Sequence, residues 1–174
     1  MVLLINKDKV AAVLQVAIGY NASEFNVFIR EAQDFDFKPL VCEEFYYDLI
    51  ENREDDVWKK IIEGGDYQYN TRTYSFRGLE DVLSYFTYAR FILKSNNVST
   101  SHGFVTKKSP HSEPLSLDEK RNHYYKYKSE ANLILEDVKK FIERNISDYP
   151  SWNSCNDNCS GSSRTGGFKT HVIK

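Results

Sequence analysis

The chain has 174 residues and a mass of 20.3 kDa, a size that predicts one domain with a buried core of normal extent. Its 23 Lys and Arg residues are opposed by 25 Asp and Glu residues, so it lacks the strong basic excess typical of nucleic-acid-binding modules. With 41% hydrophobic and 28% charged residues, the sequence is neither disordered nor membrane-embedded in character. The near-apolar run from Val10 to Ile18 is too short to cross a bilayer, so we expect no membrane partner.

The first third of the chain predicts three helices. One begins near Asn6, and a second begins at Ser23, whose hydroxyl can accept a hydrogen bond from a free backbone N–H of the first turn. The second helix must end by residues 37–38, because Pro39 disfavours helical geometry in the residue before it. Pro39 is itself suited to open a third helix, which has one apolar and one acidic stripe.

The middle of the chain predicts a short helix, a hairpin and a central helix. The short helix covers residues 55–63 and ends at Gly64-Gly65, since glycine takes the left-handed C-terminal position without penalty. Over residues 66–78, aromatic and polar side chains alternate as in a hairpin. From Leu79 onward the apolar pattern covers much of a helix circumference, so we expect this helix to touch neighbours on several sides.

The last third predicts a loop followed by the longest helix. Residues 96–114 are rich in Ser, Thr and Asn and predict a long irregular connection. A capping box, formed by Ser116 and Glu119, then begins a helix over about residues 117–146.

These elements together predict an all-α fold, a helical bundle of about five helices with a short β-like insertion and an extended C-terminal tail. After Pro150 the composition changes, and residues 151–167 contain no Leu, Ile, Val or Phe, so they cannot form a core of their own. We therefore expect a helical body over residues 1–150 and a flexible tail over residues 151–174.

No pattern in the sequence indicates catalysis or a cofactor. Cys155 and Cys159 are the nearest approach to a metal site, but structural zinc sites have two clear ligand pairs and no second pair exists here. We expect free thiols in a reducing compartment and no metal. Residues 99–102 place hydroxyls beside an imidazole, yet a catalytic set also needs an orienting third group in defined geometry. The sequence therefore predicts no enzyme and no cofactor.

A strongly acidic stretch covers residues 43–56, with seven acids and one Arg. One interpretation is a solvated helix face. The other is a surface that meets a basic partner or that repels DNA so that DNA can slide past. The acids of the predicted stripe are Glu44, Asp48, Glu51 and Asp55.

The C-terminal end has renewed β character. Phe168, Thr170 and Val172 alternate with Lys169, His171 and Ile173, so an extended strand would present two distinct faces. A Ser/Gly-rich spacer that ends in such a segment suits strand addition to another subunit. A frayed terminus is the alternative.

Six segments carry a resemblance to a known family: residues 29–32, 39–50, 76–79, 85–92, 103–108 and 112–114. The first two resemble the opening of head–tail connector proteins of tailed phages, also called portal adaptor or head completion proteins, in which two helices meet at a proline and the second carries an aromatic residue before a Leu/Ile pair. The other segments are more specific and resemble a connector-like family in phages of Bacteroidetes bacteria, including the crAss-like phages. The resemblance spans roughly residues 3–145.

The resemblance implies a non-enzymatic virion protein that assembles, after a stay in the host cytoplasm, as a homo-oligomeric ring of twelve copies between the portal protein and a neck or tail protein. Such a ring would extend the channel for double-stranded DNA without sequence-specific binding. By analogy with similar adaptors, the segment that would dock onto the portal comprises Phe168, Lys169, Thr170, His171, Val172 and Ile173. The candidate contacts with the lumen or a neighbouring subunit are Glu44, Asp48, Glu51, Asp55, His102, Phe104, Lys107 and Lys108.

Composition is consistent with this interpretation, because the 12 Tyr residues suit half-buried subunit contacts. Two other classes remain open. One is a small helical regulatory or partner-binding protein that acts as a monomer or dimer, with the acidic stripe as its docking face. The other is an enzyme of an unrecognised type.

Overall fold

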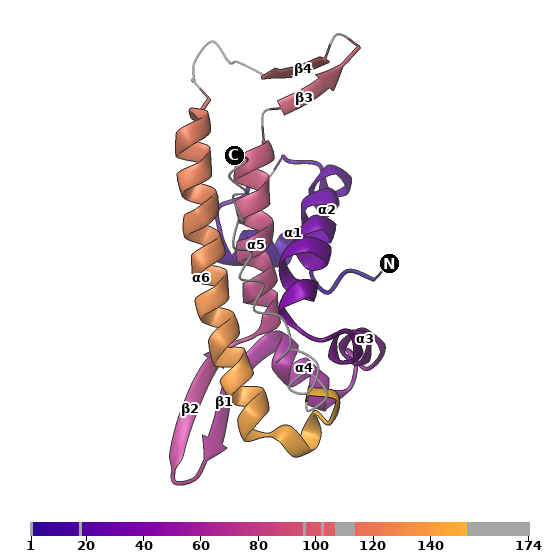
Figure 1. Cartoon of the computed structure of the whole chain (residues 1–174), viewed down its shortest axis with the longest axis vertical. Coiled ribbons are helices and arrows are strands. Elements are labelled where there is room, and N and C mark those ends of the chain that lie inside the picture. Colours follow the sequence, from indigo (N-terminus) through magenta and orange to yellow (C-terminus); the bar gives the residue numbers. More distant parts are fainter. Residues whose placement is uncertain (1, 18, 96, 102, 107–113, 153–174) are drawn as a thin grey trace, which may run out of the picture.

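The computed structural model describes residues 2–17, 19–95, 97–101, 103–106 and 114–152, with only the backbone given for 97–100 and 104–106. Within these residues the fold is mostly helical, as expected, and two short antiparallel hairpins accompany the helices (Figure 1). The α-helices are α1 (Lys7–Val13), α2 (Ala22–Glu31), α3 (Glu43–Glu51), α4 (Asp56–Glu63), α5 (Leu79–Lys94) and α6 (Leu117–Arg144). The strands are β1 (Gly64–Tyr69), β2 (Arg72–Arg77), β3 (Asn97–Thr100) and β4 (Gly103–Thr106).

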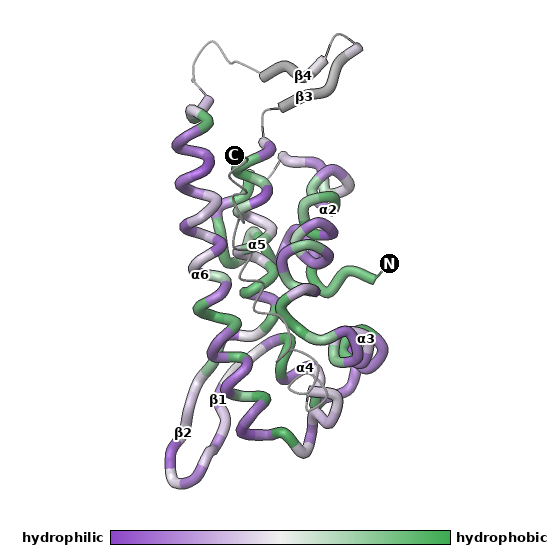
Figure 2. The backbone as a smooth tube through the Cα atoms, viewed as in Figure 1, coloured by the Kyte–Doolittle hydropathy of each residue, from purple (hydrophilic) through white to green (hydrophobic). Residues whose placement is uncertain are grey.

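Helix α5 lies at the centre of the bundle, which confirms the expectation from its broad apolar pattern. It contacts α6 along one side and α1, α2 and α4 elsewhere, so it separates α6 from α2 (Figure 1). Its side chains Val82, Leu83 and Phe86 have no exposed surface. Figure 2 shows that apolar residues recur along α5 and through the C-terminal half of α6, where they alternate with hydrophilic ones, whereas the N-terminal half of α6 is mostly hydrophilic.

The second helix begins earlier and ends differently from the prediction. Its N-cap is Asn21, whose side-chain oxygen accepts a hydrogen bond from the Ser23 backbone N–H at 2.8 Å, so Ser23 is not the cap. At its C-terminal end, α2 continues into a π-helix, η1 (Ala32–Phe37). The wider turn buries Asp36 and Phe37 and leaves Phe35 exposed.

The helical segment ends at Phe37, within the predicted limit, but Lys38 before Pro39 keeps helical backbone angles, so the predicted reason is wrong, and Pro39 does not open the third helix. It lies inside a 3-10 turn, η2 (Lys38–Leu40), and α3 begins only at Glu43. The buried face of α3 consists of Phe45, Tyr46 and Leu49. Its exposed face is therefore the acidic one.

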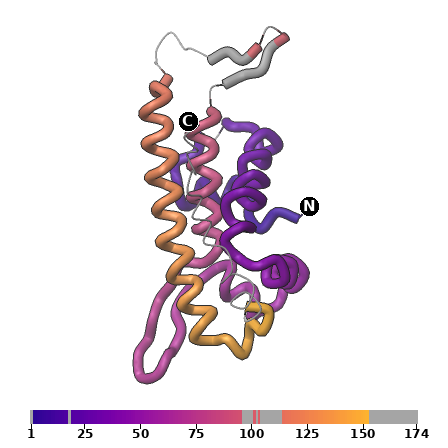
Figure 3. Tube along the Cα trace, viewed as in Figure 1, coloured from indigo at the N-terminus to yellow at the C-terminus, as the bar shows by residue number. Residues whose placement is uncertain are grey.

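The predicted first hairpin is present and projects from the bundle (Figure 3). Two glycines, Gly64 and Gly78, lie where it joins the bundle. Gly64 ends α4 with φ of 82° and also begins β1. A Cβ atom on Gly64 would lie 2.4 Å from the Gly78 backbone nitrogen, so both ends of the hairpin meet backbone to backbone. In the register, Tyr67 pairs with Tyr74, which places both rings on the face toward α6.

Residues 96–114 are not wholly irregular, because β3 and β4 form a second hairpin there. Asn97 pairs with Thr106 and Thr100 pairs with Gly103. Gly103 has φ of 115°, a conformation that few side chains adopt, and so permits the tight turn. The alternation of apolar and polar residues in these short strands was too brief to predict them.

Helix α6 begins with the predicted capping box, in which the Ser116 hydroxyl and the Glu119 carboxylate each accept from the other's backbone N–H. The helix ends at Arg144, two residues earlier than expected, and a 3-10 turn, η3 (Ile146–Asp148), follows. The core continues beyond this turn: the Trp152 ring packs edge-on against Phe45 at 4.8 Å between centroids. The expected tail from residue 153 onward lies outside the described residues.

Candidate interaction surfaces

The most strongly charged surface of the described chain is formed by α3 and its connection to α4. We call it the acidic face; its members are Glu43, Glu44, Asp48, Glu51, Glu54, Asp55 and Asp56, and all except the half-buried Asp48 are exposed. Among the described residues, Glu54 alone of these seven forms an ion pair, with its neighbour Arg53 at 3.4 Å. The other six carboxylates, five of them exposed, form no ion pair with a described residue.

The positions of these acids in the helices explain only some of the negative charges of the acidic face. Glu43 and Glu44 lie in the first turn of α3 and Asp56 in the first turn of α4, where negative charge is favourable beside free backbone N–H groups. Glu51 is the last residue of α3, where negative charge opposes the helix dipole. No local contact within the described chain compensates for Glu51.

A large aromatic residue lies in the middle of the acidic face. Tyr47 is 48% exposed and shares one row of α3 with Glu43 and Glu51, at a spacing of four residues. Lys38 borders the face: its Nζ atom lies 5.0 Å from the centre of the Tyr47 ring and donates to the Tyr47 hydroxyl at 3.4 Å. The face therefore combines negative charge with an exposed apolar surface.

The outward side of α6 presents a second unpartnered surface. We call the row Arg121, Tyr125, Ser129 and Leu133, together with the adjacent Lys126, the outer face of α6. Tyr125 is 66% exposed and Leu133 is 67% exposed, although both are large and apolar. These two side chains lie two helical turns apart with the small Ser129 between them.

The cations of this outer face are held loosely. Arg121 lies 3.7 Å from Asp118, and Lys126 lies 4.0 Å from Glu130, the limit of an ion pair. Closer to the C-terminal end of α6 the pairs are tighter, with Lys140 at 2.9 Å from Asp137. The N-terminal half of the outer face thus has the cations that are most available to a partner.

A third cluster is buried and links three elements. The Asp36 carboxylate, on η1, is 2% exposed and accepts hydrogen bonds from Arg90 on α5 and from Lys128 on α6, the latter at 3.0 Å. Partial burial lowers the pKa of Lys128, but the hydrogen bond and charge of Asp36 outweigh it, so this pKa is raised overall. Glu31 extends the cluster by pairing with Arg90 at 3.3 Å. All these charges have partners, so the cluster holds the π-helix against the bundle.

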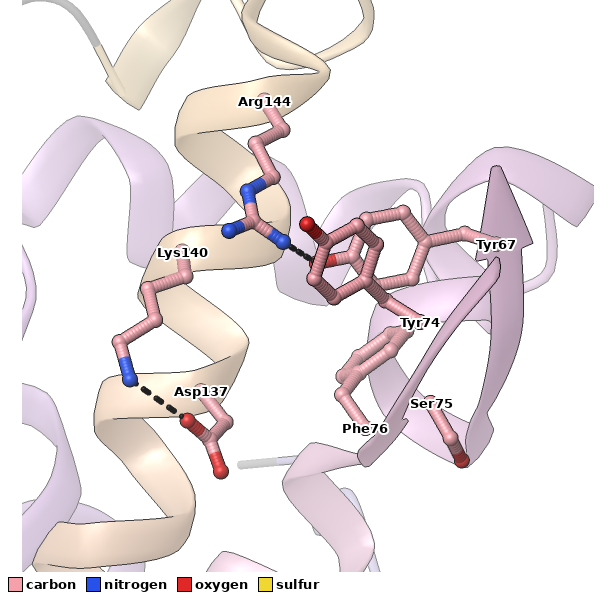
Figure 4. A pocket seen from close by; sticks show the side chains of 7 residues that line it. All are labelled: Tyr67, Tyr74, Ser75, Phe76, Asp137, Lys140 and Arg144. Carbon is pink, nitrogen blue, oxygen red and sulfur yellow. Dashed lines mark hydrogen bonds and ion pairs between the residues drawn. The ribbon is translucent and has the colours of Figure 1, made fainter. Parts of the chain in front are cut away.

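A small cavity of about 200 Å³ lies between the first hairpin and the C-terminal half of α6 (Figure 4). The Arg144 guanidinium lies 4.2 Å from the centre of the Tyr74 ring and donates to the Tyr67 hydroxyl at 2.7 Å. On the α6 side, Lys140 points to Asp137. The lining is completed by Ser75 and Phe76.

The chemistry of this cavity favours a structural role. A cation above several tyrosine rings is attractive for aromatic or anionic groups. Here Arg144 and Lys140 already have internal partners, so a ligand would have to break existing contacts. The stacked pair of Phe76 and Phe141, at 4.2 Å between centroids, shows that the hairpin is packed onto α6 as part of the core.

The sequence-predicted site residues fall into three groups. The structure brings Glu44, Asp48, Glu51 and Asp55 together on the acidic face, and their proposed role in lumen or neighbour contacts stays a prediction. Phe104 lies on β4 with only its backbone described. The remaining candidates lie outside the described residues: His102, Lys107, Lys108 and the tail residues Phe168, Lys169, Thr170, His171, Val172 and Ile173.

Two residue roles were missed by the sequence interpretation. The alternation of basic and acidic residues along the chain's longest helix is typical of a solvated face, but Lys128 and Arg144 make the contacts described above. The signal for Arg144 was present in the alternating tyrosines of the hairpin, which needed a partner. No local signal pointed to Lys128, because its partner Asp36 is distant in the sequence.

The described residues test only part of what the sequence predicts about the cysteines and about metal binding. Cys42, which precedes α3, is disulfide-bonded, which disagrees with the expectation of a reducing compartment. Cys155 and Cys159 lie outside the described residues. Within the described part of the chain, no cluster of three or more His, Cys, Asp or Glu side chains is arranged to hold a metal ion. In the same part, no helix combines the length and apolar character that crossing a membrane requires.

Comparison with known proteins identifies a family. No curated protein and no solved structure matches the chain significantly. A family model, described as a family of unknown function (DUF6712), matches residues 37–162, which include α3 to α6 and both hairpins. Because this match covers most of the chain, the protein belongs to the DUF6712 family, whose function is unknown.

Proposed function

We propose that the protein is a structural subunit of a tailed-phage virion, a connector that forms a homo-oligomeric ring between the portal and the tail. The observation that carries this proposal is that the described body exposes two surfaces suited to protein contacts, the acidic face and the outer face of α6. The acidic face has unpaired carboxylates around the exposed Tyr47, and the outer face of α6 has the exposed Tyr125 and Leu133. Exposed large side chains rimmed by charge are typical of protein contacts.

The resemblance of several segments to connector proteins supports the same proposal. Residues 76–79 and 85–92, which belong to the more specific part of the resemblance, form the end of β2 and most of α5. These segments position the hairpin and the central helix, so the resemblance includes the framework of the fold. The family match is compatible with this function and does not assign it.

In the proposed ring, the acidic face would contact a neighbouring subunit or face the DNA channel. Negative charge would keep the passing DNA from adhering. The tail segment from Phe168 to Ile173 would add a strand to the portal, and the second hairpin with Phe104, Lys107 and Lys108 would meet a neighbour or the lumen. The ring would hold about twelve copies and would act without catalysis, cofactor, metal or membrane.

The test is quantitative mass spectrometry of purified, DNA-filled particles of the phage that encodes the chain. We expect the protein in every preparation, at a copy ratio to the portal protein of about one, because adjoining rings of equal symmetry need equal numbers. Empty proheads that lack a tail serve as the control and should contain less of it. Absence from DNA-filled particles would refute the proposal.

A second candidate function is a small regulatory or partner-binding protein. The unpaired acidic face favours it, since one such face is enough to dock a basic partner. A regulator would be found in infected cells and missing from the particles, and it would remain a monomer or dimer. The particle measurement therefore separates the two functions.

A further inference from the structure

We infer that the acidic face of one copy packs against the outer face of α6 of a second copy, in a head-to-tail contact. This inference deepens the proposed function by naming the two surfaces that join the subunits. It rests on that function for its biological meaning, but the contact itself is argued from the two faces.

The two faces complement each other in charge. The acidic face has six carboxylates without an ion pair to any described residue, whereas the outer face of α6 has two exposed cations whose ion pairs are long, Arg121 at 3.7 Å from Asp118 and Lys126 at 4.0 Å from Glu130. Elsewhere on α6, exposed lysines keep carboxylates at 2.9 to 3.0 Å. Arg121 and Lys126 therefore have the weakest ion pairs on α6, and they lie on the face that also exposes Tyr125 and Leu133.

The two faces also complement each other in shape. On α3, Tyr47 projects from a row between Glu43 and Glu51. On α6, Ser129 leaves a low point between Tyr125 and Leu133, which are eight residues and therefore about 12 Å apart. A tyrosine ring inserted above Ser129 would contact both large side chains, and the flanking carboxylate on the N-terminal side of Ser129 would lie beside Lys126 and Arg121.

The position of the faces determines the type of contact. The central helix α5 separates α6 from α2, and α3 lies on the same side of α5 as α2 (Figure 1). A copy therefore cannot close its own acidic face onto its own α6. When one copy has used its acidic face, its α6 remains free for the next copy, so the contact is heterologous and repeats, and it closes a ring if the rotation per subunit divides the circle.

The test uses two blocked variants of the full-length chain. In the first, Glu44→Lys and Tyr47→Lys disrupt the acidic face; in the second, Tyr125→Glu and Leu133→Glu disrupt the outer face of α6. All four side chains are at least half exposed or close to it, so the circular-dichroism spectrum and the melting temperature should match those of the wild type. The matched control introduces one Lys and one Glu on the solvent face of the first hairpin, as Gln68→Lys and Thr73→Glu.

Sedimentation and native mass spectrometry, at protein concentrations up to about 1 mM, read the result. We expect the wild type and the control to self-associate and each blocked variant to remain monomeric. Mixing the two blocked variants should produce a dimer of one copy each and nothing larger, because each variant retains the face that the other lacks.

Three results would overturn the inference: a wild-type chain that stays monomeric throughout the range, blocked variants that still assemble, or a mixture that fails to form the dimer. If the self-association test fails and the protein is nevertheless present in virions, the inference about these two contact faces is wrong and the proposed function stands. Head-to-tail association of a protein that is absent from virions would refute the proposed function alone.

Discussion

Two groups of carboxylates in this protein have opposite surroundings. Asp36 and Glu31 lie between η1, α5 and α6, and both have cationic partners within the same chain. Those of the acidic face lie on α3 and before α4, and one of seven has an ion pair with a described residue. The two groups are only a few residues apart in the sequence.

The difference separates charges that maintain the fold from charges that the fold does not need. A buried carboxylate without a partner would be very costly, so Asp36 is compatible with the core only because two cations reach it. The acidic face bears no such constraint, since water solvates its charges. Its unpaired side chains are therefore available for contacts with other molecules.

The largest expected effect comes from removing the buried charge. Asp36→Ala should lower the free energy of unfolding by about 3 kcal/mol, because the partly buried Lys128 would lose its counter-charge and Arg90 would keep only Glu31. Urea denaturation followed by circular dichroism measures it. The control Glu24→Ala, an exposed acid on α2 for which no ion pair with a described residue is seen, should change stability much less. An equal loss in both variants would contradict the structural role of Asp36.

A smaller effect is expected at Tyr149, a buried polar group whose partner is neutral. Its hydroxyl donates to the Val57 backbone oxygen at 2.8 Å, and Tyr149→Phe should cost about 1 kcal/mol at pH 7. Burial raises the pKa of Tyr149 above its ordinary value of 10.0, so the folded chain keeps a proton that the unfolded chain loses. Wild-type stability should therefore fall as pH rises above about 10.

The pH dependence provides the control for this variant. Tyr149→Phe has no phenolic proton to lose, so the stability difference between wild type and variant should shrink between pH 9 and about pH 11. Urea denaturation at each pH measures it. A constant difference would show that Tyr149 ionises as freely in the folded chain as in the unfolded one.

The smallest expected effects are on the acidic face, and they differ in sign. Glu51→Gln should raise the free energy of unfolding by about 0.3 kcal/mol, since it removes a negative charge from the C-terminal end of α3. Glu44→Gln, in the first turn of the same helix, should lower it by a similar amount. Differential scanning calorimetry at low salt resolves the two. A large loss from either variant would mean that the acidic face contributes to the fold.

The local elements were predictable because their causes are local. The capping box at Ser116, the helix end at Gly64 and the paired tyrosines of the first hairpin each depend on residues within a few positions. The acidic face was also visible in advance as a run of charges. Errors occurred where two local signals competed, as at Asn21 and Ser23, or where strands were too short for a pattern, as in the second hairpin.

The sequence by itself determined the helical character of this protein, the central position of the helix that begins at Leu79 and the presence of an acidic stripe. Only the tertiary structure decided which charges are satisfied: it buried Asp36 between Arg90 and Lys128, placed Arg144 over the hairpin tyrosines and left six of the seven carboxylates of the acidic face without an ion pair to a described residue. The physical reason is distance along the chain. Periodicity and capping act over one or two helical turns, whereas ion pairs and ring contacts join residues that only the packing of helices brings together.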